Sequence, residues 1–133
     1  MRNKIYKYTN ESAQTIFVPF LKGIYFDLTW LKCVDGLCTA KKGYKWDGCS
    51  PKFRVFGRII GTPDGKNNET KNASMWHDVF YQYKRYLTEL GVKRKDVDLF
   101  FLHNLQKSNW KYSKTYYIGV RVFGGFYGSW DTK

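Results

Sequence analysis

The chain has 133 residues and a formal net charge of +12 at pH 7, from 23 Lys and Arg against 11 Asp and Glu. Hydrophobic residues make up 43% of it and aromatic residues 20%, which excludes a generally disordered chain because so many rings must be buried. The length favours a single domain, residues 1–133, with one core.

The first part of the chain, residues 1–61, is predicted to be rich in β-strands. Pro19 has no amide donor for a sheet ladder, so the strand at 15–21 is expected at a sheet edge. Asp35-Gly36 is typical of a tight hairpin turn. Alternating or β-branched runs predict strands at 4–8, 15–21, 23–31, 31–34, 37–40 and 54–60.

An irregular loop is predicted where the strands give way to Tyr44–Pro51. Asp47 and Gly48 favour a turn there, and Ser50 precedes a proline. Trp46, Asp47, Gly48 and Ser50 are therefore candidates for contacts with a substrate, or for purely structural loop positions. No nucleophile elbow surrounds Ser50, so serine catalysis is not expected.

The second part is predicted to hold two helices and a closing strand. Helices at about 72–87 and 93–107 give a helical hairpin over 70–108, antiparallel because the connection is short. The β-branched and aromatic run 115–123 predicts a strand that returns to the sheet. This order favours the α+β class, a small antiparallel β-sheet with a two-helix antiparallel hairpin.

The residues with the clearest chemistry lie on these two helices. Asp98 falls on the apolar face of the second helix, where a carboxylate is costly without a partner. We expect it to bind one ring nitrogen of His77, leaving the other as a general base for water, with Tyr81 donating its hydroxyl to Asp98. Asp96 is the alternative partner. Alternatively, the pair of His77 and Asp98 is purely structural: it satisfies the buried carboxylate and holds the two helices together.

Asp78, next to His77, is a candidate ligand for a hard cation such as Ca²⁺, with carbonyl oxygens from the 46–48 loop. A solvent-facing helix position or a loop anchor is the alternative. A zinc site is not expected, because the three cysteines lack the paired spacing that such sites use. These cysteines are Cys33, Cys38 and Cys49.

The basic charge favours polyanionic partners such as anionic lipid. Lys and Arg are dispersed, with a densest run of only three residues at 93–95 and no recognisable nucleic-acid motif, so nucleic acid is expected to bind only nonspecifically. No apolar run has the length of a transmembrane segment. The odd cysteine count and the absence of an apolar signal segment favour synthesis in a reducing cytoplasm.

The spacing His77-Asp78-x-x-Tyr81, with Asp98 downstream on an antiparallel helix, resembles the active-site helix pair of secreted phospholipases A2. The resemblance implies that His77 is the base, that Asp78 binds calcium, and that Asp98 and Tyr81 orient the histidine. It covers these helices alone. The family's cysteines beside the His-Asp helix and its glycine-rich calcium loop have no counterpart here.

A longer resemblance is to an uncharacterised domain family of tailed-phage and prophage genomes. It implies a phage-encoded protein made in the cytoplasm of the bacterial host, and it supplies no activity. Two functions remain open: an esterase acting on a lipid or other ester, and a non-catalytic virion component or host-directed binding protein that contacts phage structural proteins. The motifs are Gly-Tyr-x-Trp-Asp-Gly-x-Ser at 43–50, Ala-Ser-x-x-His-Asp-x-x-Tyr at 73–81, Arg-x-x-Ala-Asp-x-x-Phe at 94–101 with Val97 replacing Ala, and Gly-Val-Arg-x-Phe-Gly-Gly at 119–125.

Overall fold

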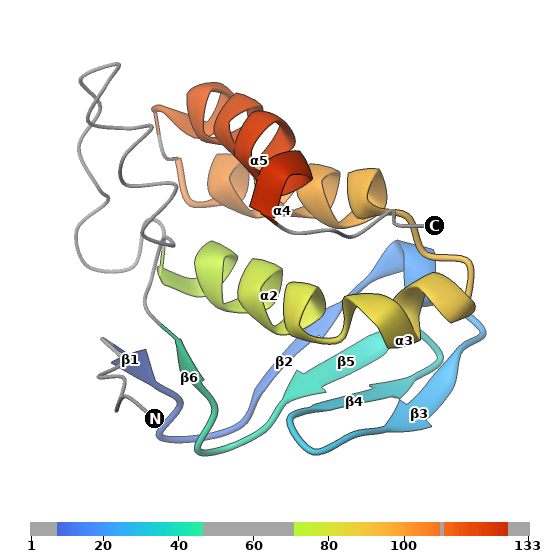
Figure 1. Ribbon diagram of the computed structural model, residues 1–133. Helices are drawn as coiled ribbons and strands as arrows, with labels where there is room; N and C mark the ends of the chain where they lie inside the picture. The colour runs from blue at the N-terminus through green and yellow to red at the C-terminus, as the bar shows by residue number, and fades with distance from the viewer. Residues whose placement is uncertain (1–7, 47–70, 110, 128–133) are drawn as a thin grey trace, which may run out of the picture. The chain divides into compact units, whose positions relative to one another are not determined.

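The computed structural model describes residues 8–46, 71–109 and 111–127 (Figure 1). The chain divides into two compact units, residues 1–48 and residues 49–133. Strands in two small antiparallel sheets build the first unit, and helices build the second. The predicted α+β class is therefore confirmed.

The first unit contains a two-stranded and a four-stranded antiparallel sheet. The larger sheet has the strand order β2-β5-β4-β3, so β2 lies at an edge as Pro19 predicted. The strand predicted at 15–21 is shorter, because Pro19 begins the 3-10 helix η1, where its fixed φ and missing amide donor suit a first helical position. The bounds are β1 Tyr8–Thr9, β2 Gln14–Phe17, η1 Pro19–Leu21, β3 Tyr25–Asp27, β4 Leu31–Val34, β5 Leu37–Ala40 and β6 Lys45–Trp46.

The hairpin turn between β4 and β5 is formed by Asp35 and Gly36, as predicted. Their φ angles are 50° and 86°, the pair of positive values that a two-residue turn of this kind requires. The turn brings Cys33 opposite Cys38 across the two strands, and both are buried free thiols. Burial raises the pKa of the Cys38 thiol, and the adjacent Cys33 adds to this effect. Cys38 is therefore held as a neutral, weakly nucleophilic thiol.

Gly36→Ala should destabilise the protein more than Gly23→Ala. Both glycines have a positive φ, so each alanine adds strain of about 1 to 2 kcal/mol. A Cβ at Gly36 would also lie 3.2 Å from the backbone oxygen of Val18 and 3.3 Å from Cα of Lys22, whereas a Cβ at Gly23 meets nothing within 4 Å. We expect Gly36→Ala to cost about 1 to 3 kcal/mol more in urea denaturation. Equal free energies of unfolding for the two variants would contradict this packing.

In the second unit, residues 71–109 and 111–127 form four helices. Figure 1 shows α2 and α4 running antiparallel, with α5 beside α4. The hairpin is as predicted, except that the first helix is interrupted: Tyr83 lies between α2 and α3. Gly91, with a φ of 90°, supplies the turn that precedes α4. The bounds are α2 Lys71–Gln82, α3 Lys84–Glu89, α4 Arg94–Lys107 and α5 Ser113–Tyr127.

The closing strand predicted at 115–123 is wrong, because these residues belong to α5. Tyr116 and Val120 are both buried, one helical turn apart, in a cluster with Phe101 and Leu105 of α4 and Ala73 of α2. Packing at helical spacing therefore outweighs the strand preference of the β-branched and aromatic residues here. The strand predicted at 54–60 lies outside the described residues.

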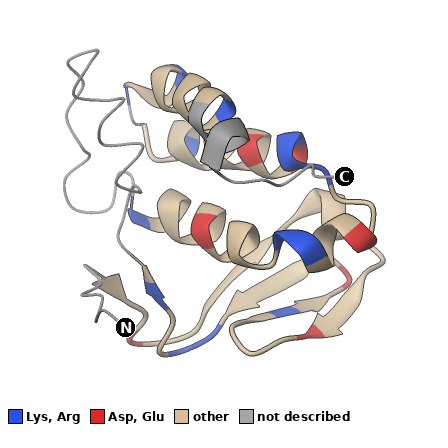
Figure 2. Cartoon of the chain, viewed as in Figure 1, with Lys and Arg blue, Asp and Glu red and all other residues tan. Residues whose placement is uncertain are grey.

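Basic side chains are distributed over both units. Figure 2 shows Lys and Arg on strands and helices alike, in keeping with the dispersed charge of the sequence. Of the helices that the structure describes, none combines the length and the apolar character needed to cross a bilayer.

Candidate functional site

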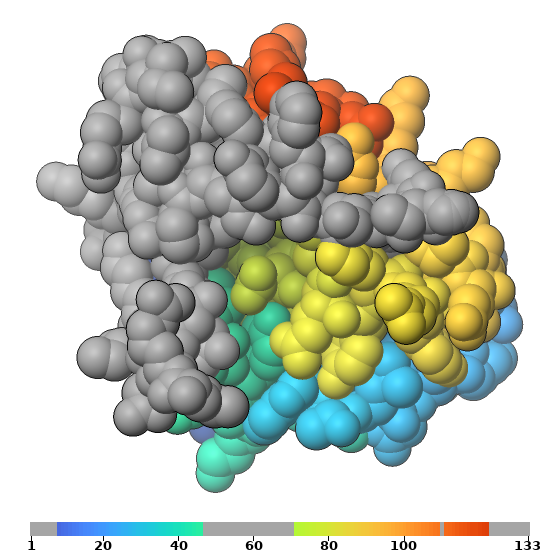
Figure 3. Space-filling view, viewed as in Figure 1, coloured from blue at the N-terminus to red at the C-terminus, as the bar shows by residue number. Residues whose placement is uncertain are grey.

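Helix α2 carries two of the predicted site residues. His77 and Tyr81 lie one turn apart, at the edge of the helix's buried face, and both are half-buried. Part of α2 is visible on the face drawn in the space-filling view (Figure 3). The residues of α2 that are buried are Ala73, Ser74, Met75, Trp76, Val79 and Phe80. This burial holds the helix in place and leaves the imidazole at the margin of the core.

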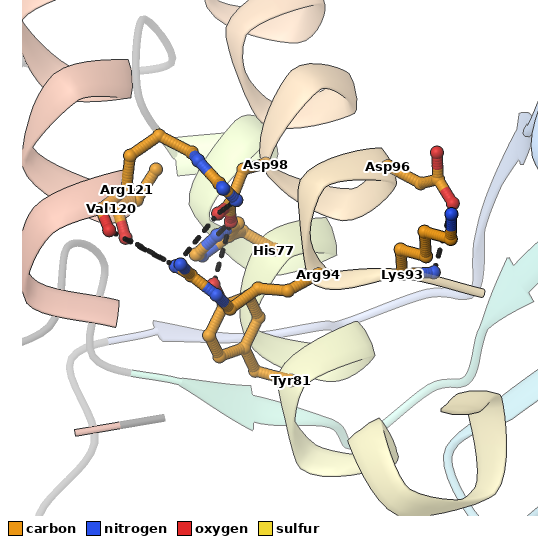
Figure 4. Close-up of polar contacts among 8 residues, drawn as sticks. All are labelled: His77, Tyr81, Lys93, Arg94, Asp96, Asp98, Val120 and Arg121. Carbon is orange, nitrogen blue, oxygen red and sulfur yellow. Dashed lines mark hydrogen bonds and ion pairs between the residues drawn. The ribbon is translucent and has the colours of Figure 1, made fainter. Parts of the chain in front are cut away.

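Asp98 of α4 is the centre of the site, and its side chain is fully buried. Its oxygen Oδ1 lies 2.8 Å from Nε2 of His77 and accepts a hydrogen bond of 2.7 Å from the hydroxyl of Tyr81. Its other oxygen, Oδ2, accepts from Nη1 of Arg94 at 3.3 Å and from Nη1 of Arg121 at 3.0 Å. Figure 4 shows these side chains converging on one carboxylate. The predicted pairing of Asp98 with His77 and Tyr81 is present in the structure.

Four donors occupy the four lone-pair positions that a carboxylate offers. Two of the donors are guanidinium groups that the sequence analysis did not assign to the site. Arg94 precedes Asp98 by one turn of α4, and Arg121 comes from α5. Arg94 also donates to the backbone carbonyls of Val120 and Arg121 and so ties α4 to α5. The i, i+4 spacing of Arg94 and Asp98 was a usable signal for the first arginine.

The contacts of the His77 imidazole indicate which of its two nitrogens carries the proton. Because Nε2 faces a carboxylate oxygen, the neutral ring carries its proton on Nε2 and its lone pair on Nδ1. Nδ1 has no hydrogen-bond partner among the residues that the structure describes. The ring packs against Tyr81 and Phe101, with centroids 4.3 Å and 4.6 Å away, and 16% of its side chain is exposed. The ring is thus fixed on one side and reaches solvent in part.

The Tyr81 hydroxyl is held in its protonated form. Burial raises the pKa of Tyr81 well above its usual value, and the negative charge of Asp98 raises it further. A phenol with a raised pKa acts as a donor rather than as a base. Tyr81 therefore supports Asp98 and takes no proton at neutral pH.

Tyr81→Phe should remove a pH-dependent part of the stability. The native state keeps the phenol proton at pH values where the unfolded chain has lost it, because the pKa is raised on folding. The stability from this group is complete below the ordinary tyrosine pKa of about 10 and declines as the pH rises above it. Losing a hydrogen bond to a charged group costs about 1.5 to 3 kcal/mol. Urea denaturation at pH 8 should show this cost, and at pH 11 the gap between the proteins should narrow; a constant gap would contradict the assignment.

Asp78 is half-buried on α2, next to His77. Within the described residues, no three His, Cys, Asp or Glu side chains form a group that could hold a metal ion. Calcium binding at Asp78, with carbonyl oxygens from the 46–48 loop, therefore stays a prediction.

The other predicted loop residues have different outcomes. Trp46 is not in a loop: it is a buried residue of β6, paired in register with Tyr8 and stacked on Tyr44. Its large ring is better buried in a sheet than exposed in a turn. Asp47, Gly48 and Ser50 lie outside the described residues.

Asp96, the alternative partner of His77, has another role. Its Oδ2 accepts a hydrogen bond of 3.0 Å from the backbone amide of Lys93 at the start of α4. Figure 4 shows the two residues away from the Asp98 cluster. Asp96 therefore caps the helix.

Comparisons of the chain with models of known protein families, with curated proteins and with solved structures find no match. The resemblances to phospholipases A2 and to the phage family therefore remain predictions from motifs.

Proposed function

We propose that this protein is an ester hydrolase of the phospholipase A2 kind, acting on a lipid or other ester with His77 as the general base. The observation that supports the proposal is the asymmetry of the ring. Nε2 lies 2.8 Å from a buried carboxylate oxygen, while Nδ1 has no hydrogen bond within the described part of the chain. A base of this kind needs a lone pair that water can reach, and the side chain is partly exposed.

The proposed reaction begins with water bound at Nδ1. As the water oxygen attacks the ester carbonyl, its proton passes to Nδ1 and the ring becomes an imidazolium. When the tetrahedral intermediate collapses, the bond to the alcohol oxygen breaks and the proton on Nδ1 passes to that oxygen. The products are a carboxylic acid and an alcohol, and the imidazole returns neutral.

Asp98 and Tyr81 act through the ring. The carboxylate of Asp98 holds the Nε2 proton, fixes the orientation of the ring and stabilises the imidazolium. The hydroxyl of Tyr81 binds the same oxygen and keeps it directed at Nε2. Both residues are positioning residues, because neither touches the reacting atoms.

The motifs support a phage origin for this enzyme. We therefore place its synthesis in the cytoplasm of a bacterial host, with packaging in the virion as the alternative. Anionic lipid is the partner that suits the net charge of +12.

The proposal is tested with the purified full-length chain, 4-nitrophenyl butyrate and dihexanoylphosphatidylcholine. We expect hydrolysis of at least one ester, at a rate that rises with pH to a plateau as a single group loses its proton. Parallel assays with added calcium and with a chelator decide whether the reaction depends on calcium. No turnover of either ester under both conditions would contradict the proposal.

A non-catalytic role is the second candidate, favoured by the complete burial of Asp98. Its contacts join α2, α4 and α5, as expected of a polar lock in a helical core. In that case the protein is a virion component or a host-directed binding protein, and His77 contributes to stability alone.

A further inference from the structure

We propose that Arg121 forms an oxyanion-binding subsite beside His77, so that the ester cleaved carries a phosphate or carboxylate group near its reacting carbonyl. This inference rests on the proposed function, because it names the substrate class of the same site. A phosphate of a lipid headgroup and a phosphate of a small soluble ester share this chemistry.

The first argument is the charge around Asp98. Its single negative charge is shared by two guanidinium groups, both bound to Oδ2. One arginine is enough to neutralise a carboxylate, so the second brings a positive charge beyond the need of the pair. The Arg121 side chain stays partly in water, so this second positive charge remains available to attract an anionic substrate group.

The second argument is the way the two arginines use their donors. Arg94 is 10% exposed and binds Asp98 and two backbone carbonyls. Arg121 is 31% exposed. Among the described residues its guanidinium makes one hydrogen bond, from Nη1 to Asp98. Its Nε and Nη2 therefore bind no described residue, and together they form the edge of a guanidinium that grips an oxyanion with two parallel hydrogen bonds.

The third argument is position. His77 and Arg121 bind the two oxygens of one carboxylate, at 2.8 Å and 3.0 Å. The imidazole and the guanidinium are therefore neighbours, as Figure 4 shows. A substrate that binds Arg121 through its anionic group would therefore lie beside the ring of the proposed general base. Such binding would orient the ester for attack.

The first test measures binding of inorganic phosphate by NMR titration of the arginine side-chain signals. Arg121→Gln should weaken phosphate binding roughly 10- to 100-fold, the effect of one charge-assisted pair. Arg121→Lys should retain part of the affinity, because it keeps the charge without the fork. Arg85→Gln, an exposed position on α3, removes the same charge and is the matched control. Equal losses in Arg121→Gln and Arg85→Gln would overturn the subsite in favour of dispersed charge.

The second test compares an anionic ester, mono-4-nitrophenyl glutarate, with the neutral 4-nitrophenyl valerate. The wild-type protein should prefer the anionic ester, and Arg121→Gln should reduce the ratio of the two kcat/KM values roughly 10-fold or more, mainly through KM. An equal loss of kcat/KM for both esters would overturn the proposal, because Arg121 would then act only by holding Asp98 against His77.

The source of the phosphate is decided with vesicles. If sedimentation of the protein with phosphatidylglycerol vesicles depends on Arg121, the phosphate is that of a lipid headgroup. If the protein binds free phosphate through Arg121 but does not sediment with the vesicles, the substrate is a small soluble ester.

Failure of this inference is distinct from failure of the proposed function. Phosphate binding that depends on Arg121, in a protein that cleaves no ester, would support the subsite and contradict the hydrolase. Hydrolysis without an anionic preference would contradict the subsite alone.

Discussion

His77→Gln is expected to abolish ester hydrolysis while the protein stays folded. The longer glutamine amide can place an N–H where Nε2 donates to Asp98, but it cannot accept a proton from water. Losing a general base lowers kcat by roughly 10²- to 10⁴-fold. The melting temperature should fall by no more than about 4 °C, the shift that roughly 1 kcal/mol produces in a domain of this size. Initial rates on 4-nitrophenyl butyrate and thermal unfolding of the same preparations measure both effects.

The chain supplies its own control for this substitution, because it has two histidines. His103 is exposed on α4, and His103→Gln should leave both activity and melting temperature unchanged. Undiminished activity in His77→Gln would show that the ring is not the base. A large loss of stability in His77→Gln, with no activity in the wild-type protein, would favour the structural role.

Asp98→Ala is expected to cause the largest loss of stability of any substitution at the site. Removing the carboxylate leaves the guanidinium groups of Arg94 and Arg121 without their shared anion, and it strips His77 and Tyr81 of their acceptor. Breaking a buried pair in this way costs about 3 to 5 kcal/mol. Urea denaturation monitored by tryptophan fluorescence and by circular dichroism measures the difference.

Asp96→Ala is the matched control, on the same helix and two residues away. It removes an aspartate that caps α4 from a half-buried position, and its cost should be about 1 kcal/mol. The stability cost of Asp98→Asn should lie between the costs of Asp98→Ala and Asp96→Ala, because the amide keeps the side-chain volume and one acceptor oxygen. A cost for Asp98→Ala no greater than that for Asp96→Ala would contradict the network.

The sequence was sufficient to predict the pairing of Asp98 with His77. Helical periodicity placed Asp98 on an apolar face, and the cost of a buried carboxylate demanded a partner there. The hairpin turn at Asp35 and Gly36 was equally accessible, because positive φ angles restrict the choice of residues. Both predictions depend on local rules that the surrounding structure does not override.

Helix α5 and the role of Arg121 could not be predicted in the same way. Residues 115–123 have strand-forming side chains, and their packing at helical spacing against α4 and Ala73 of α2 outweighs that preference. The error removed Arg121 from consideration, since a strand returning to the sheet would not have brought its side chain to Asp98. The contact between Arg121 and Asp98 spans 23 residues, which no periodicity of a single element reveals.

The most direct test of the account is the protonation of His77 Nδ1, followed by ¹⁵N NMR across the pH range in which the esterase rate is measured. The account predicts that Nε2 keeps its proton throughout, and that the fraction of unprotonated Nδ1 follows the same curve as kcat/KM. A rate that rises with pH while Nδ1 shows no matching change, or a neutral ring protonated on Nδ1, would contradict it.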